Sequence, residues 1–188
     1  MPLEIATTPL KDVLLITPPR FGDHRGFFSE SWNRKALEAQ GVHLPEFVQD
    51  NHSMSSQVGT VRGLHFQAPP NAQGKLVRCG RGRIFDVAVD VRIGSPTYGQ
   101  WFGTELSFEN ARQLWIPGGF LHGFMTLEPD SEIVYKCTDH YAPESDGSVH
   151  WDSCGIDWPL EGITPAISPK DEQAQTLADF QSPFTYED

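Results

Sequence analysis

Short alternating runs, separated by glycine and proline, dominate this chain. Nine segments place apolar and polar side chains in turn: 12–16, 26–32, 60–66, 75–79, 83–91, 104–108, 113–116, 120–127 and 132–137. Between them stand groups such as "TPPRFGD", "QAPPNAQG" and "WIPGG", and the 188 residues include 17 Gly and 15 Pro. Short runs with turn signals at this spacing predict an all-β sandwich or barrel.

Two segments are predicted to be helical. Residues 33–41 offer Asn33 as the N-cap and Gly41 as the stop, and residues 168–179 open with Ser168 and Pro169. No interdomain linker or repeat is present, so we expect residues 1–188 to form a single domain. An N-terminal strand should precede the barrel, and the tail beyond about residue 155 should lie against the sheets.

Charge and cysteine content narrow the range of functions. The formal net charge of −11 argues against binding to nucleic acid or to an anionic membrane. Cys79, Cys137 and Cys154 show no CxxC spacing, which favours a reducing compartment without structural zinc. No run approaches 18 apolar residues and no signal peptide is evident, so a cytoplasmic protein is expected. In so acidic a chain, a local cluster of Arg and Lys predicts a site for a small anion.

Period two assigns the polar side chains to faces. In the run 83–91, Asp86 falls on the face opposite the apolar valines; in the run 60–66, Arg62 and His65 fall on opposite faces. The barrel strands therefore carry several polar side chains where aliphatic ones are usual: Asp86, His65, His122 and Tyr135. Such a pattern is typical of a barrel that holds a ligand.

Each of these residues also fits a structural role. His65 could be a half-buried histidine bonded to the backbone, and Tyr135 a core tyrosine. Asp171, three residues after Ser168, suits a capping box. A metal site of the His-x-His type is disfavoured because Gln67 occupies the second position.

Collinear motifs give the chain a family resemblance. From Asp12 to Asp171 the sequence resembles the dTDP-4-dehydrorhamnose 3,5-epimerase family, on the segments "FGDHRGFFSESWN", "FVQDNHS", "VRGLHFQ", "NAQGKLVRC", "FDVAVDVR", "SPTYGQW", "RQLWIPGGFLHGF" and "YKCTDHYAPESDGS". The resemblance implies a cupin-like jelly roll, a double-stranded β-helix with short flanking helices, that forms a homodimer. It also implies a nucleoside-diphospho-4-keto-sugar substrate and no cofactor or metal.

The resemblance further implies roles for individual residues. His65 would be the base, Asp171 would orient its imidazole, Tyr135 would be the acid, and Lys75 would stabilise the enolate oxygen. Tyr141 would stack on the thymine ring. The substrate-binding set would be Arg25, Glu30, Gln49, Asp50, Asn51, Arg62, Lys75, His122, Tyr141, Asp146 and Lys170. Asp146 stands where many relatives carry Glu.

Three alternatives remain at this point. One is an epimerase acting at C3 only or C5 only, or a ketoisomerase of a related deoxysugar pathway. A second is a sugar-nucleotide-binding module without chemistry, which would not need a histidine paired with a carboxylate. A third is a metal-dependent cupin oxygenase, against which Gln67 argues.

Overall fold

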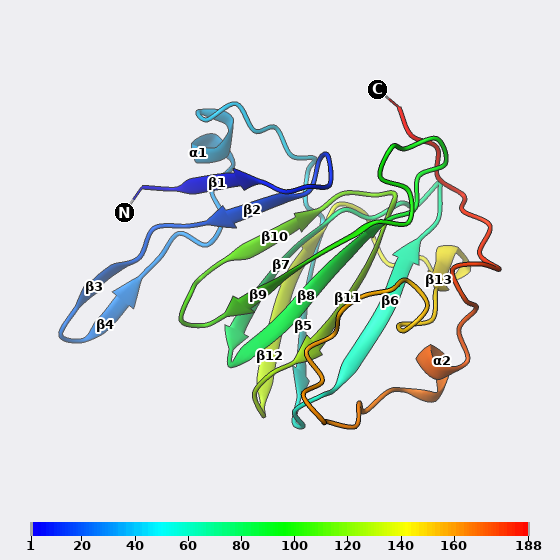
Figure 1. Cartoon of the computed structure of the whole chain (residues 1–188). Helices are drawn as coiled ribbons and strands as arrows, with labels where there is room; N and C mark the ends of the chain where they lie inside the picture. The colour runs from blue at the N-terminus through cyan, green and yellow to red at the C-terminus, as the bar shows by residue number, and fades with distance from the viewer. Residues whose placement is uncertain (1, 188) are drawn as a thin grey trace.

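The computed structural model describes residues 2–187, and most of its regular structure is β-strand (Figure 1). The strands are β1 (Glu4–Thr7), β2 (Leu14–Thr17), β3 (Phe21–Asp23), β4 (Gly26–Phe28), β5 (Gln49–Ser55), β6 (Val61–Gln67), β7 (Lys75–Arg81), β8 (Arg83–Asp90), β9 (Trp101–Ser107), β10 (Gln113–Ile116), β11 (Phe120–Thr126), β12 (Ser131–Cys137) and β13 (Asp146–Ser148). The helices are α1 (Arg34–Glu38), α2 (Pro169–Glu172) and the 3₁₀ turn Pro143–Ser145.

Two antiparallel sheets face each other across a common interior. One has the strand order β1-β2-β10-β7-β12-β5 and the other β13-β6-β11-β8-β9. Apart from β1–β2 and β8–β9, neighbours in each sheet are far apart in sequence, as when β10 pairs with both β2 and β7. This interleaving of strands between two sheets is the cupin-like jelly roll, so the predicted fold is confirmed.

One end of the interior is apolar. Val77 of β7, Ile84 of β8, Leu106 of β9 and Ile133 of β12 have no solvent exposure and belong to one core cluster. Burying each such side chain contributes about 1.5–3 kcal/mol to folding. The polar residues that the sequence placed on these strands lie toward the other end, where β7 begins and β12 ends.

The outer face of the five-stranded sheet is covered by the C-terminal tail. Val61, Leu64 and Met125 of the sheet pack in one cluster with Trp158 and Phe180 of the tail. Parallel bridges join the tail to the sheet at Thr60–Ala166 and Val149–Gln175, and Figure 1 shows the tail, in orange and red, running beside β6. The prediction for this tail is confirmed.

The outer face of the six-stranded sheet is partly covered by α1. Leu37 packs with Ile16, Leu76 and Trp115. The N-cap prediction is confirmed, because Asn33 Oδ1 accepts a hydrogen bond from Ala36 N at 3.2 Å. The predicted stop is also confirmed, since Gly41 takes a φ of 80° that a side chain would disfavour.

Three expectations about elements were wrong. The predicted helix 168–179 is only α2, because the backbone of Gln175 instead accepts a bond from His150 N at 2.7 Å and bridges to Val149. The predicted strand 26–32 is only β4, which pairs with β3 in a separate ribbon that extends away from the barrel in Figure 1. Strand β5 was missed because its sequence, QDNHSMS, lacks apolar alternation. In the described part of the chain, α1 and α2 are far too short to cross a bilayer.

Candidate active site

A bulge in β6 brings Arg62 and His65 to the same face. His122 of β11 pairs with His65 and Phe124 pairs with Arg62, so three steps along β6 match two along β11. The extra residue lies near Gly63, whose φ is 108° and where an added Cβ would lie 2.6 Å from the carbonyl oxygen of His122. Only glycine fits there. The bulge corrects the expectation that Arg62 and His65 lie on opposite faces, because strict period two does not survive an inserted residue.

His65 forms a dyad with Asp171 across 106 residues of chain. Its Nε2 lies 2.6 Å from Asp171 Oδ1, and Gly63 N donates to Asp171 Oδ2 at 3.3 Å. Burial of Asp171 opposes ionisation, but these hydrogen bonds prevail and lower the pKa of its carboxyl. The Asp171 carboxylate is therefore ionised at neutral pH and is suited to orient the imidazole and to stabilise its protonated form.

The structural alternative for Asp171 is realised through its backbone N–H. Ser168 Oγ accepts a hydrogen bond from Asp171 N at 3.1 Å and so caps α2. The Asp171 carboxylate points to His65, and the Ser168 hydroxyl makes a smaller contribution that also lowers the pKa of the carboxyl. This cap stabilises the first turn of the helix, whereas the hydrogen bonds from Gly63 N and His65 hold the carboxylate in place.

The dyad borders an open pocket of about 370 Å³. Its lining residues come from β6 and from the segment leading into α2: Thr60, Val61, Arg62, His65, Ala166, Ile167, Ser168, Lys170 and Asp171. The side chain of His65 is 33% exposed while that of Asp171 is 4% exposed. A substrate can therefore reach the imidazole but not the carboxylate behind it.

Lys75 and Tyr135 lie on the opposite sheet, on adjacent strands β7 and β12. Burial lowers the pKa of Lys75, against opposing effects of Cys137, Asp146 and Asp86. Burial also raises the pKa of Tyr135, so the phenol keeps its proton at neutral pH. Tyr135 packs against the interior core cluster, on the same side of its sheet as the buried Val77.

His122 forms a second histidine–aspartate pair deeper in the barrel. Its Nε2 lies 2.8 Å from Asp86 Oδ1, and both side chains are buried. Burial lowers the pKa of His122, with Asp86 opposing and Lys75 and His65 reinforcing the shift. Sequence reasoning placed Asp86 in the interior but did not find this pairing; the alternation of His122 and Asp86 on their strands was the available signal.

Further predicted residues lie around the rim of this end. Lys170 Nζ is 2.5 Å from Asp146 Oδ2, and Tyr141, an exposed aromatic, donates its backbone N–H to Gln49 Oε1 at 2.9 Å. Gln49 in turn donates to Asn51 Oδ1 at 3.1 Å. These contacts place two aromatic or cationic side chains, Tyr141 and Lys170, at the mouth of the barrel.

Three predicted residues are not brought to this region within one chain. Arg25 lies at the tip of the β3–β4 ribbon, paired with Asp23 at 2.5 Å. Glu30 accepts a hydrogen bond from Asn33 at 3.0 Å beside α1. Asp50 lies on the outer face of its sheet, where it pairs with Lys136 at 2.9 Å. Alternation along β5 puts Asp50 opposite its neighbours Gln49 and Asn51.

Gln67 has a structural use that the sequence did not indicate. Its amide nitrogen donates to the carbonyl oxygens of Asn71 and His140 at 2.6 and 3.0 Å, and its Oε1 accepts from Ala142 N at 2.9 Å. The side chain thus ties two loops together beneath the barrel mouth. Over residues 2–187, no group of three or more His, Cys, Asp or Glu side chains is arranged to hold a metal ion.

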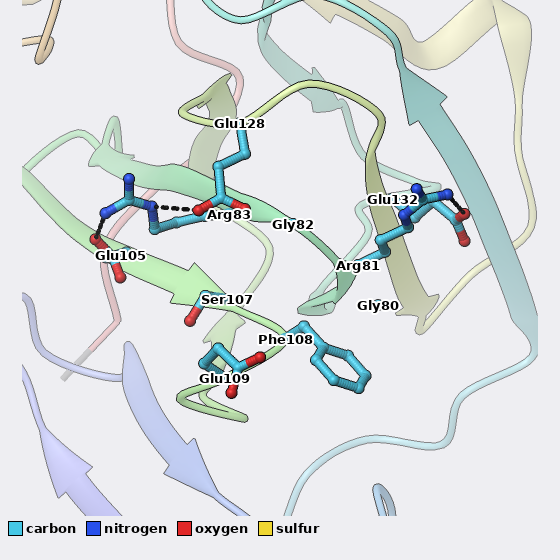
Figure 2. Close-up of a pocket in the computed structure, with 10 residues that line it drawn as sticks. All are labelled: Gly80, Arg81, Gly82, Arg83, Glu105, Ser107, Phe108, Glu109, Glu128 and Glu132. Atoms are coloured by element: carbon cyan, nitrogen blue, oxygen red, sulfur yellow. Dashed lines mark hydrogen bonds and ion pairs between the residues drawn. The ribbon is translucent and has the colours of Figure 1, made fainter.

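A larger pocket, of about 750 Å³, lies at the other end of the barrel, around the β7–β8 turn (Figure 2). Most of its charged side chains are paired with one another: Arg83 with Glu105 at 3.3 Å and with Glu128 at 3.2 Å, and Arg81 with Glu132 at 4.0 Å. None of the residues predicted for the site lines it.

The fold and the site together define a cupin-like jelly-roll enzyme, with His65 of one sheet paired to Asp171 of α2 and a half-buried lysine and tyrosine on the other sheet. A family model described as dTDP-4-dehydrorhamnose 3,5-epimerase matches residues 7–179. The dTDP-4-dehydrorhamnose 3,5-epimerase of Salmonella typhimurium is 52% identical over 175 residues, which cover 92% of this chain and 94% of the relative.

Solved structures agree. The dTDP-6-deoxy-D-glucose-3,5-epimerase of Legionella pneumophila, in complex with dTDP-4-keto-L-rhamnose, matches with a TM-score of 0.93 at 46% identity, over 99% of this chain and all of that one. A 3'-monoepimerase from Streptomyces bikiniensis, in complex with dTDP-quinovose, matches with a TM-score of 0.83 at 36% identity, over 92% and 88% of the two chains. The chain belongs to the dTDP-4-dehydrorhamnose 3,5-epimerase family, whose members are isomerases.

Proposed function

We propose that this protein inverts C3 and C5 of dTDP-4-dehydro-6-deoxyglucose and releases dTDP-4-dehydro-L-rhamnose. The observation that carries the proposal is the His65–Asp171 dyad at 2.6 Å, bordering an open pocket on the sheet opposite Tyr135 and Lys75. A module that only binds sugar nucleotides has no use for a histidine oriented by a buried carboxylate.

The reaction needs two groups on opposite sides of the sugar. The hydrogens on C3 and C5 are acidic because both carbons are bonded to the C4 ketone. His65 removes such a proton and an enolate forms with its charge on the C4 oxygen. Tyr135 returns a proton to the same carbon from the other face, which inverts the centre. Each general acid–base step contributes about 10²–10⁴-fold.

Lys75 serves the charge that develops on the C4 oxygen. An ammonium held in the partly desolvated interior of a protein stabilises an oxyanion more than it would in water. Asp171 serves the other charge, that of the imidazolium, and keeps the ring in one orientation. Together these groups stabilise both ions of the enolate state without a cofactor or metal.

The rim residues suit the nucleotide. Arg62 and Lys170 are cations at the pocket that contains His65 and can pair with the diphosphate. Tyr141 offers an exposed ring on which thymine can stack. The other proposed substrate-binding residues at this end of the barrel are Gln49, Asn51, His122 and Asp146. Asp146 forms an ion pair with Lys170.

Arg25, Glu30 and Asp50 fit a site completed by a second copy of the chain. We propose a homodimer in which the β3–β4 ribbon and the adjoining segment reach the partner's pocket. We also propose a cytoplasmic location, and the net charge of −11 supports a protein that binds neither nucleic acid nor an anionic membrane.

One experiment tests the proposal and its nearest alternative. The protein is incubated with dTDP-4-dehydro-6-deoxyglucose in deuterated water, and label at C3 and C5 is read separately by NMR. Label and inversion at both carbons are expected. Label at C3 alone would make this protein a single-centre epimerase, as the 3'-monoepimerase from Streptomyces bikiniensis is named. Binding without label at either carbon would leave only a binding module.

A further inference from the structure

Asp86 is a buried carboxylate with one oxygen unaccounted for. It has no solvent exposure on the interior face of β8. Oδ1 is 2.8 Å from His122 Nε2, whereas Oδ2 has no hydrogen-bond partner within residues 2–187. A buried anion with a free oxygen is destabilising unless a cation lies close enough to offset its charge.

The cation that faces Asp86 across the interior is Lys75. Three groups favour the charged form of Lys75 and so raise its pKa: Cys137, Asp146 and Asp86. Burial raises the pKa of the Cys137 thiol, which stays neutral, and the carboxylate of Asp146 is already 2.5 Å from Lys170. In the described part of the chain, Asp86 has no ion pair with Lys170 or any arginine, and its one bonded partner is His122.

The Asp171 carboxylate at this end is ionised, but it is already bonded to His65 and to the N–H of Gly63. The imidazoles of His65 and His122 are neutral or cationic by nature, and the Tyr135 phenol keeps its proton because burial raises its pKa. Asp86 is thus the carboxylate available to balance Lys75. Asp86 also fixes the tautomer of His122. A carboxylate can only accept a hydrogen bond, so Nε2 of His122 must carry the proton and donate it to Asp86.

We propose that Asp86 is a positioning residue that balances the charge of Lys75 and holds His122 in one tautomer and orientation. This inference rests on the proposed function, in which Lys75 must be charged when the enolate forms. Without Asp86, a lysine buried in this interior would lose its proton at lower pH, and the oxyanion would lose its partner. His122 would be free to turn its ring within the pocket.

The kinetic test is Asp86→Asn, which keeps the shape and an acceptor for His122 but removes the charge. We expect kcat to fall at least tenfold near pH 8, and the alkaline limb of the kcat–pH profile to move down by about one pH unit or more. Asp12→Asn is the matched control, since it removes a carboxylate from a half-exposed pair with Arg92. Its profile should keep the wild-type limb. An unmoved limb in Asp86→Asn, whatever its kcat, would overturn the proposal.

A stability cycle tests the pairing without any turnover. Asp86→Asn is measured in wild type and in Lys75→Met by denaturant unfolding. If the two charges balance, the Asp86 change costs less in the Lys75→Met background, or even stabilises it. Recovery of folding in the double variant, should a single variant not fold, supports the pairing equally. Equal costs in both backgrounds would overturn it. If wild type does not turn over the substrate, the proposed function fails, and this cycle still decides the role of Asp86.

Discussion

At the scale of single residues, Asp171 has a structural role through its backbone and a proposed catalytic role through its side chain. The backbone N–H of Asp171 bonds to Ser168 Oγ and caps α2, whereas its carboxylate bonds to His65 and to the N–H of Gly63. The capping hydroxyl can be removed while the carboxylate stays. Stability and catalysis should therefore respond to different substitutions.

His65→Ala should abolish both product formation and solvent exchange, because no other group at the pocket is placed to remove the proton. Asp171→Ala should lower kcat by about 10²–10⁴-fold through loss of imidazole orientation and charge stabilisation. Ser168→Ala is the control for α2: it should cost about 1 kcal/mol in the free energy of unfolding and leave kcat nearly unchanged.

Turnover and unfolding by urea are measured on the same preparations. If Asp171→Ala lost only stability, as Ser168→Ala is expected to do, the carboxylate would be a structural group and the dyad would have no catalytic part.

Tyr135→Phe should separate proton removal from proton return. The ring volume is almost unchanged, so folding should be little affected. With the phenol gone, the enolate regains a proton only from the His65 side, which restores the original configuration. In deuterated water we expect label in unepimerised substrate and little inverted product, read by NMR. An epimerisation rate equal to wild type would show that Tyr135 only packs.

Activity should also survive dialysis against EDTA. Gln67 occupies the second position of a His-x-His pattern. Its side-chain amide is hydrogen-bonded to the backbone of Asn71, His140 and Ala142 and is not available as a metal ligand. Turnover is compared before and after dialysis. A loss that an added divalent metal restores would refute the acid–base mechanism as proposed.

At the scale of elements, β8 carries two buried aspartates on one face with different uses. Asp86 serves the site, whereas Asp90 accepts hydrogen bonds from Arg92, Ser95 and Thr97 at 2.7–3.0 Å. The motif "FDVAVDVR" followed by "SPTYG" therefore serves two purposes. Asp86 belongs to the site, and Asp90 organises the β8–β9 loop by accepting hydrogen bonds from its side chains.

Acid stability should depend on Asp90. Burial opposes its ionisation, but the bonds from Arg92 and its neighbours prevail and lower its pKa below the ordinary 3.8. Its contribution to folding is thus complete above the unfolded pKa near 3.8 and is lost as pH falls through the lower folded value. Asp90→Asn should cost about 3 kcal/mol at pH 7 and show a weaker loss of stability below pH 4.

Urea unfolding from pH 7 down to pH 2.5 measures this effect. Glu105→Gln, in an exposed pair with Arg83, should change stability by less than about 1 kcal/mol at any pH. A stability curve for Asp90→Asn parallel to that of wild type in acid would contradict the assignment.

At the scale of the whole molecule, the N-terminal ribbon is the part that the barrel does not explain. Strands β3 and β4 extend beyond the sheets in Figure 1, with Phe21, Phe27 and Phe28 exposed by 47–65%. Arg25 lies at the turn between them. An apolar ribbon with a cation at its tip is suited to cover a second copy of the chain and to reach that copy's site.

Complementation tests this arrangement. In the Arg25→Ala homodimer, each site should lack the cation that the partner supplies. In the His65→Ala homodimer, each site should lack its base. Both homodimers should therefore be impaired. When the two variants are mixed in equal amounts, unfolded and refolded together, about half of the dimers should be heterodimers. Each heterodimer has one intact site out of two, so about a quarter of wild-type activity should return. A mass of twice the 21.0 kDa chain is expected in solution. No recovery from mixed dimers would mean that Arg25 acts within its own chain or not at all.

Local pattern determined the strands and the faces they bury. Alternation in segments such as 83–91 and 132–137 depends only on side chains two residues apart, and groups of glycine and proline mark the turns between strands. The same holds for Asn33 and Ser168, since an N-cap bond spans three residues. His65, Tyr135 and Asp171 were indicated by a family resemblance rather than by any local pattern.

Tertiary contacts decided the rest. The bulge at Gly63, which turns Arg62 to the side of His65, depends on the register of β6 against β11. The early end of α2 depends on the bond between His150 and Gln175, and the outward position of Asp50 on which face of β5 meets the interior. The 2.6 Å contact of His65 with Asp171 joins residues 106 apart. Propensity and capping act within a few residues, whereas register and long-range hydrogen bonds exist only once distant strands have been brought together.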